Sequence, residues 1–159
     1  MTPYDSVARY QLEERMKSGA RWFYWIAALS LVTSVVSLAG GSWGFFISLG
    51  VTQVIDALAT AIAAESGWGF KAVAFGFDLV AAGLFALFGY FAVKHHEWAF
   101  VAGMALYLLD ALVFVVARHW LGLAFHAFAL YSMYGGYKAA AALAELDGRA
   151  APHAAAPAV

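Results

Sequence analysis

Apolar residues fill the chain in long blocks, separated by short stretches of glycine and charged residues. The blocks cover residues 22–39, 45–64, 71–93, 98–117 and 121–137. An α-helix needs about 20 apolar residues to cross the hydrocarbon core of a bilayer, and each block is close to that length. The pattern therefore predicts an all-α, polytopic membrane bundle with five transmembrane helices. Four is the alternative count, with the last block lying only at the membrane surface.

The two ends of the chain differ from these blocks. Residues 1–21 carry many charges beside a thin apolar stripe, and Thr2, Pro3 and Asp5 have the spacing of a helix start. We therefore expect a short amphipathic helix that leads from the cytoplasm into a single transmembrane domain over residues 22–144. Residues 145–159 are rich in alanine and proline, and we expect this tail to be disordered.

Composition narrows the class of protein. Of the 159 residues, 64% are hydrophobic and 12% are charged, whereas soluble domains average about 45–50% apolar and about 25% charged residues. The expected surroundings are therefore a lipid bilayer. The net charge of −1 and the lack of a basic, aromatic-rich cluster argue against a nucleic-acid partner. The chain has no cysteine and no recognisable nucleotide, zinc or hydrolase motif, so no cofactor is expected.

Tryptophan and basic residues locate the membrane surfaces. All six tryptophans fall near block ends, as is typical of membrane proteins: Trp22, Trp25, Trp43, Trp68, Trp98 and Trp120. With five alternating crossings, six Lys and Arg residues lie on the side of the N-terminus and three on the other side. The positive-inside rule then predicts a cytoplasmic N-terminus and a C-terminus on the opposite side of the membrane.

Four ionisable residues interrupt the apolar blocks: Asp56, Asp78, Asp110 and His126. A charge at the centre of a membrane helix costs about 2.5–3.5 kcal/mol on insertion scales, so such residues usually face a protein interior. In the alternating topology all four lie roughly 8–12 Å from the cytoplasmic face. The sequence therefore predicts one polar layer in the cytoplasmic half of the bundle, with supporting polar groups from Thr52, Gln53 and Tyr107.

Carboxylates and an imidazole at one depth suit a proton relay or a site for a small hard cation. We expect Asp56 and Asp110 to form its central pair, because two carboxylates in a low dielectric need a proton or a cation between them. A transport pathway would require a homo-oligomer, since five short spans enclose little volume. The protein would then bind a proton or small cation within the membrane.

Two other functions fit the same residues. The polar side chains serve equally well as hydrogen-bond links between helices in a non-catalytic subunit or scaffold that packs against a larger membrane complex. An intramembrane enzyme that uses a pair of aspartates is the second alternative, although the sequence favours a protein without enzymatic activity. Outside the layer, His95, His96 and Glu97 form either a surface metal site or a solvated loop.

Overall fold

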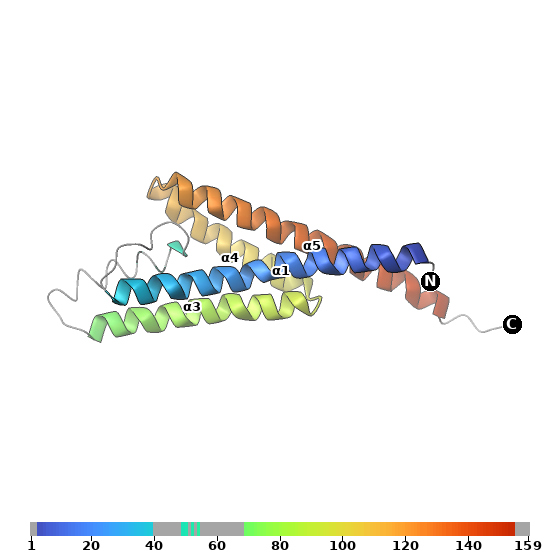
Figure 1. The fold of residues 1–159 in the computed structure, drawn as a ribbon, viewed down its shortest axis with the longest axis horizontal. Helices are drawn as coiled ribbons and strands as arrows, with labels where there is room; N and C mark the ends of the chain where they lie inside the picture. Colours follow the sequence, from blue (N-terminus) through green and yellow to red (C-terminus); the bar gives the residue numbers. More distant parts are fainter. Residues whose placement is uncertain (1–2, 40–48, 51, 53, 55–68, 155–159) are drawn as a thin grey trace.

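The computed structural model describes residues 3–39, 49, 50, 52, 54 and 69–154, which form a helical bundle (Figure 1). Its helices are α1 (Pro3–Leu38), α3 (Gly69–Val93), α4 (Glu97–Val116) and α5 (Trp120–Ala154). The all-helical prediction is confirmed for the described residues, which contain no strand. The count of five is not matched, since four complete helices are found in the described part of the chain. The block at 45–64 lies almost wholly outside the described residues.

The four helices run up and down in sequence order. α1 contacts α3 and α5, and α4 contacts the same two helices, so the bundle is closed on itself. We call the end with the start of α1, the α3–α4 turn and the last turns of α5 the terminal end. We call the end with Leu38, Gly69 and the α4–α5 turn the distal end (Figure 1).

The start of α1 and the end of α5 both lie at the terminal end, whereas the sequence predicts that the two termini face opposite sides of the membrane. The guanidinium of Arg9 near the start of α1 lies 2.6 Å from a carboxylate oxygen of Asp147 near the end of α5. The difference arises because α1 ends and α3 begins at the same end of the bundle (Figure 1). The sequence prediction required these two ends to lie one crossing apart.

Two helices are much longer than a membrane span. The amphipathic lead-in and the first apolar block form one continuous helix α1 of 36 residues, about 54 Å long. Helix α5 continues through residues 145–154, which we had expected to be disordered. Alanine-rich sequence has high helix propensity, and the turns of α5 just before this stretch are buried in the same core as α1, with Met16, Ala20, Ala139, Ala140 and Leu143.

Aromatic packing fills the terminal half of the bundle. The ring of Phe23 lies within 6.4 Å of those of Phe85, Phe88 and Phe100. A Cβ atom at Gly103 would come within 2.4 Å of the Phe23 ring, so the glycine allows α4 to approach α1. These residues make a tight hydrophobic core that joins α1, α3 and α4.

Large apolar side chains also cover the outer surface, including Val73, Val80, Leu109 and Val116, each at least 60% exposed. Among the described residues, three helices are long and apolar enough to cross a membrane: Ser6–Val36, Ala72–Val93 and Glu97–Val116. An apolar exterior of this extent fits lipid rather than water. These features indicate a protein that is embedded in a membrane.

The α3–α4 and α4–α5 turns share one geometry. His95 and Arg118 both have left-handed backbones, with φ of 68° and 54°. The amide of the next residue bonds back in each case, from His96 to the carbonyl of Phe91 and from His119 to that of Phe114. This is the helix C-terminal pattern that usually places glycine at the left-handed position.

Candidate functional site

Asp110 and His126 form a buried pair in the distal half of the bundle. The Nε2 atom of His126 lies 3.0 Å from Oδ2 of Asp110, and the two residues are 0% and 4% exposed. Asp110 is six residues before the end of α4, and His126 is six residues after the start of α5. The tight turn between these helices therefore brings both side chains to one depth, about 9 Å from the distal end.

The hydrogen bonds of His126 define how many protons the pair holds. Its Nδ1 atom lies 2.8 Å from the carbonyl oxygen of Gly122, which can only accept, so Nδ1 carries a proton. A bond between Nε2 and Asp110 then needs one further proton, on either the imidazole or the carboxyl group. The pair is an imidazolium with a carboxylate, or a neutral imidazole with a carboxylic acid, and both forms share one proton.

A backbone amide meets the same carboxylate oxygen from another segment. The N–H of Gly50 donates to Oδ2 of Asp110 at 2.8 Å. Gly50 is helical and the preceding Leu49 is not, so this N–H belongs to the first turn of a helix, where amides have no helical partner. Negative charge on Asp110 is thus compensated by both Gly50 and His126.

Aromatic rings from α4 enclose the imidazole. The ring of Tyr107 stacks on His126 at a centroid distance of 4.3 Å and an angle of 14°, and that of Phe114 lies 4.5 Å away. Tyr107, Asp110 and Phe114 are spaced by three and four residues, so they share one face of α4. The imidazole of His126 therefore lies against the rings of Tyr107 and Phe114, with its Nε2 atom facing the carboxylate of Asp110.

Two glycines leave room for the ring of Phe114 to pack against His126. A Cβ atom at Gly122 would come within 2.3 Å of the Phe114 ring, and one at Gly50 within 2.7 Å. Any side chain at either position would displace the ring that packs against His126. Nothing in the sequence alone marks Phe114, Gly50 or Gly122 as part of the site, because phenylalanine and glycine are common in apolar blocks.

Asp78 lies in the same half of the bundle, on α3. It is fully buried, and it is seven residues from Phe85, whose ring contacts Tyr107 at 6.0 Å. Asp110 is only three residues from Tyr107, so Asp78 lies roughly 6 Å nearer the distal end than Asp110. The two acids are thus about one helix turn apart in depth.

Other buried polar groups lie near the level of Asp78 in the bundle. Ser30 of α1 is seven residues from Phe23, which places it at the level of Asp78, and Ser34 is one turn further along. Thr52 is also buried, and its hydroxyl donates to the carbonyl of Leu49 at 2.8 Å. The hydroxyl of Ser34 donates to the carbonyl of Ser30 at 3.1 Å.

The structure thus brings together part of the expected layer. Asp110 and His126 are bonded, Tyr107 stacks on the pair, and Asp78 and Thr52 are buried in the same half. Asp56 and Gln53 lie outside the described residues, so the Asp56–Asp110 pair stays a prediction. The layer lies in the half away from the N-terminus, opposite to the half that five alternating crossings required.

The described residues contain no cluster of three or more His, Cys, Asp or Glu side chains arranged to hold a metal ion. His95 and His96 instead belong to the α3–α4 turn, where both are exposed.

Comparison of the chain with protein-family models, with curated proteins and with solved structures finds no match.

Proposed function

We propose that this membrane protein takes up and releases a proton at the Asp110–His126 pair, as part of moving a proton or small cation. One observation supports this above all: the bond from Nδ1 to the Gly122 carbonyl requires a shared proton between Nε2 and Asp110. If that proton leaves, a lone pair on Nε2 faces a carboxylate oxygen at 3.0 Å. Loss of the proton therefore breaks the link between α4 and α5.

A route to the pair would begin at the distal end. Asp78 lies about one turn nearer that end than Asp110 and is the next carboxyl group along the bundle among the described residues. On the other side, the rings of Phe23, Phe85, Phe88 and Phe100 fill the core. A complete path across the membrane would thus run between copies of the chain, which is why we propose a homo-oligomer within the lipid bilayer.

A scaffold or subunit of a larger complex is the second candidate. It is favoured by the enclosure of the pair between Tyr107 and Phe114 and by the mutual bonding of its polar atoms. In that case the pair only links helices. The intramembrane enzyme has less support, because Asp110 is bonded to a histidine and Asp78 lies a turn away.

The arrangement of the helices also supports an orientation. The terminal end carries seven of the nine Lys and Arg residues, and only Lys71 and Arg118 lie at the distal end. The positive-inside rule places the end richer in basic residues in the cytoplasm. We propose that both termini are cytoplasmic and that the Asp110–His126 pair lies in the outer half of the membrane.

The Asp110→Asn variant separates the two candidates. Asparagine keeps the shape, and its atom at the Oδ2 position can either accept from the Gly50 amide or donate to a neutral His126, but it cannot hold the shared proton. We expect proteoliposomes with this variant to lose the pH-dependent flux of the wild type, while the protein stays folded. Asp147→Asn removes a carboxylate from the surface and serves as the matched control. Equal flux in Asp110→Asn and wild type, or none in the wild type, would favour the scaffold.

A further inference from the structure

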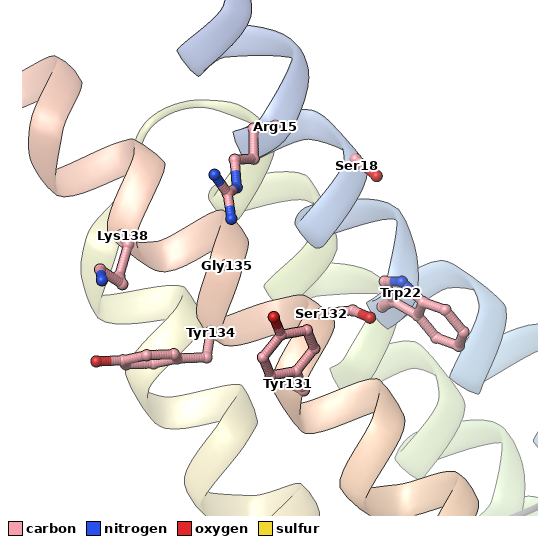
Figure 2. Close-up of a pocket in the computed structure, with 8 residues that line it drawn as sticks. All are labelled: Arg15, Ser18, Trp22, Tyr131, Ser132, Tyr134, Gly135 and Lys138. Atoms are coloured by element: carbon pink, nitrogen blue, oxygen red, sulfur yellow. The ribbon is translucent and has the colours of Figure 1, made fainter.

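A groove lined by charged, polar and aromatic side chains lies between α1 and α5, on the terminal side of the Asp110–His126 pair (Figure 2). Its volume is about 320 Å³. The residues that matter for its chemistry are Arg15 and Trp22 from α1 and Tyr131, Ser132, Gly135 and Lys138 from α5. The groove opens on the outer surface of the bundle, where a membrane protein meets lipid.

The contact between the two helices explains why a groove forms here. A Cβ atom at Gly19 would come within 2.6 Å of the Cα atom of Gly136, so the backbones of α1 and α5 touch. Arg15 precedes this contact by one turn on α1 and reaches across to α5. Its Nε atom is 3.9 Å from where a Cβ atom of Gly135 would lie (Figure 2).

The groove lies at the level of the lipid headgroups. A Cβ atom at Gly136 would lie 3.0 Å from the ring of Phe100, which is only four residues past the α3–α4 turn at His96. The groove is therefore within about 6 Å of the level where the chain turns outside the apolar core. Exposed Trp98 and Tyr90 beside the same turn mark a membrane surface there.

Its two basic side chains are available to an anion. Arg9 and Lys17 of α1 form salt bridges with acidic residues, whereas Arg15 and Lys138 have no carboxylate partner within 4 Å in the described part of the chain. Lys138 lies 5.9 Å over the ring of Tyr134, and the side chain of Tyr131 is 74% exposed. A guanidinium, an ammonium and a phenol hydroxyl are all donors suited to phosphate oxygens.

The groove changes from charged to apolar along its length, as a phospholipid changes from headgroup to acyl chains. The charged groups lie nearest the terminal end, and the surface becomes apolar toward the bilayer centre. There the ring of Trp22 packs edge-on against Phe128 at 5.3 Å and Phe125 at 6.1 Å. A headgroup phosphate held by Arg15 and Lys138 would place its acyl chains along these rings.

We propose that this groove binds a phosphate group, supplied by an anionic phospholipid of the leaflet at the terminal end. Basic pockets between membrane helices on the cytoplasmic side are typical headgroup sites, and this end carries most of the basic residues. Free phosphate has the same oxygen chemistry, so the experiment must distinguish the two sources. The site does not depend on proton binding at Asp110 and His126.

The test measures binding of fluorescent phosphatidylglycerol to the full-length protein in a neutral detergent. Arg15→Gln/Lys138→Gln removes the two cations of the groove, and Arg21→Gln/Lys94→Gln removes two cations of the same end outside it. At about 1 kcal/mol for each basic residue, the first variant should bind at least tenfold more weakly. The control pair should change the affinity less than twofold. Gly135→Leu keeps every charge but fills the groove, and it should match the first variant.

Four results would overturn the proposal in whole or in part. Equal losses in both double variants would show that binding follows overall charge and not the groove. Full binding to Gly135→Leu would show that the lipid sits elsewhere. If millimolar inorganic phosphate displaces the lipid, the site takes free phosphate and the lipid source is wrong, and if phosphatidylcholine binds equally well, the preference for an anionic headgroup is wrong.

Discussion

The two halves of the bundle are built from the same four helices but are held together differently. In the terminal half, the buried stripe is aromatic and aliphatic, with Phe23, Phe85, Phe88 and Phe100 at its centre. In the distal half, the same stripe becomes polar, with Ser30, Ser34, Asp78, Asp110 and His126 buried. Close packing joins the helices in one half, and in the other half the bond between Asp110 and His126 joins α4 to α5.

The change occurs along each helix without any break in periodicity. On α3 the buried face passes from Phe85 through Ala82 to Asp78, and on α1 it passes from Phe23 through Ala27 to Ser30. Packing alone would have been satisfied by more apolar residues at these positions. Buried polar groups cost free energy unless they are paired, so the polar half is where a chemical role is expected and the apolar half is where stability is expected.

The largest effect should come from breaking the contact between α1 and α5 in the terminal half. A Cβ atom at Gly19 meets the backbone of Gly136, which cannot rotate away, so Gly19→Val should cost about 3 kcal/mol or more of unfolding free energy. Gly83→Val is the matched control, since nothing lies within 4 Å of its Cβ position. Equilibrium unfolding in a mild detergent measures both. Similar losses in the two variants would contradict the close crossing.

In the distal half, His126→Phe should be the most damaging single change. It removes one of the donors to a buried carboxylate and should cost about 3 kcal/mol of unfolding free energy. The double variant His126→Phe/Asp110→Leu removes the carboxylate as well and should recover a large part of that loss. The same unfolding assay applies. If the two losses simply add, the Asp110–His126 bond contributes nothing to the fold.

Substitutions in the turns should change the unfolding free energy least, and the change should stabilise the protein. His95→Gly relieves a left-handed backbone at an exposed position and should raise the unfolding free energy by about 1 kcal/mol. His96→Gly is the matched control, because His96 has an ordinary φ of −84° and its ring packs on Phe91. A gain from the control that equals the gain at His95 would contradict the role of the positive φ.

The helices and part of the site could be predicted because their signals are local. An apolar block of about 20 residues predicts a helix without knowledge of the segments around it. An aspartate or histidine inside such a block stands out as a candidate for a buried site. Asp78, Asp110, His126 and Tyr107 were found in this way. Thr52 was found from its place on the polar stripe of the second block.

The direction in which each helix runs and the contacts between helices could not be predicted in this way. Block lengths do not encode that Leu38 and Gly69 lie at the same end, so they do not place the end of α5 or the polar layer relative to the start of α1. The alanine-rich end of α5 continues a helix whose preceding turns pack on α1 and whose Asp147 pairs with Arg9, contacts that composition does not reveal. Phe114, Gly50 and Gly122 become part of the site only through tertiary contacts.

The central claim, a shared proton in the Asp110–His126 pair, is tested most directly by ¹⁵N NMR of the His126 ring in lipid nanodiscs. We expect Nδ1 to be protonated, and we expect the Nε2 signal of the wild type to differ from that of Asp110→Asn, where His126 is neutral. His126→Gln assigns the signal among the five histidines. An imidazole with a proton on Nε2 and none on Nδ1, or identical ring signals in the wild type and Asp110→Asn, would contradict a shared proton.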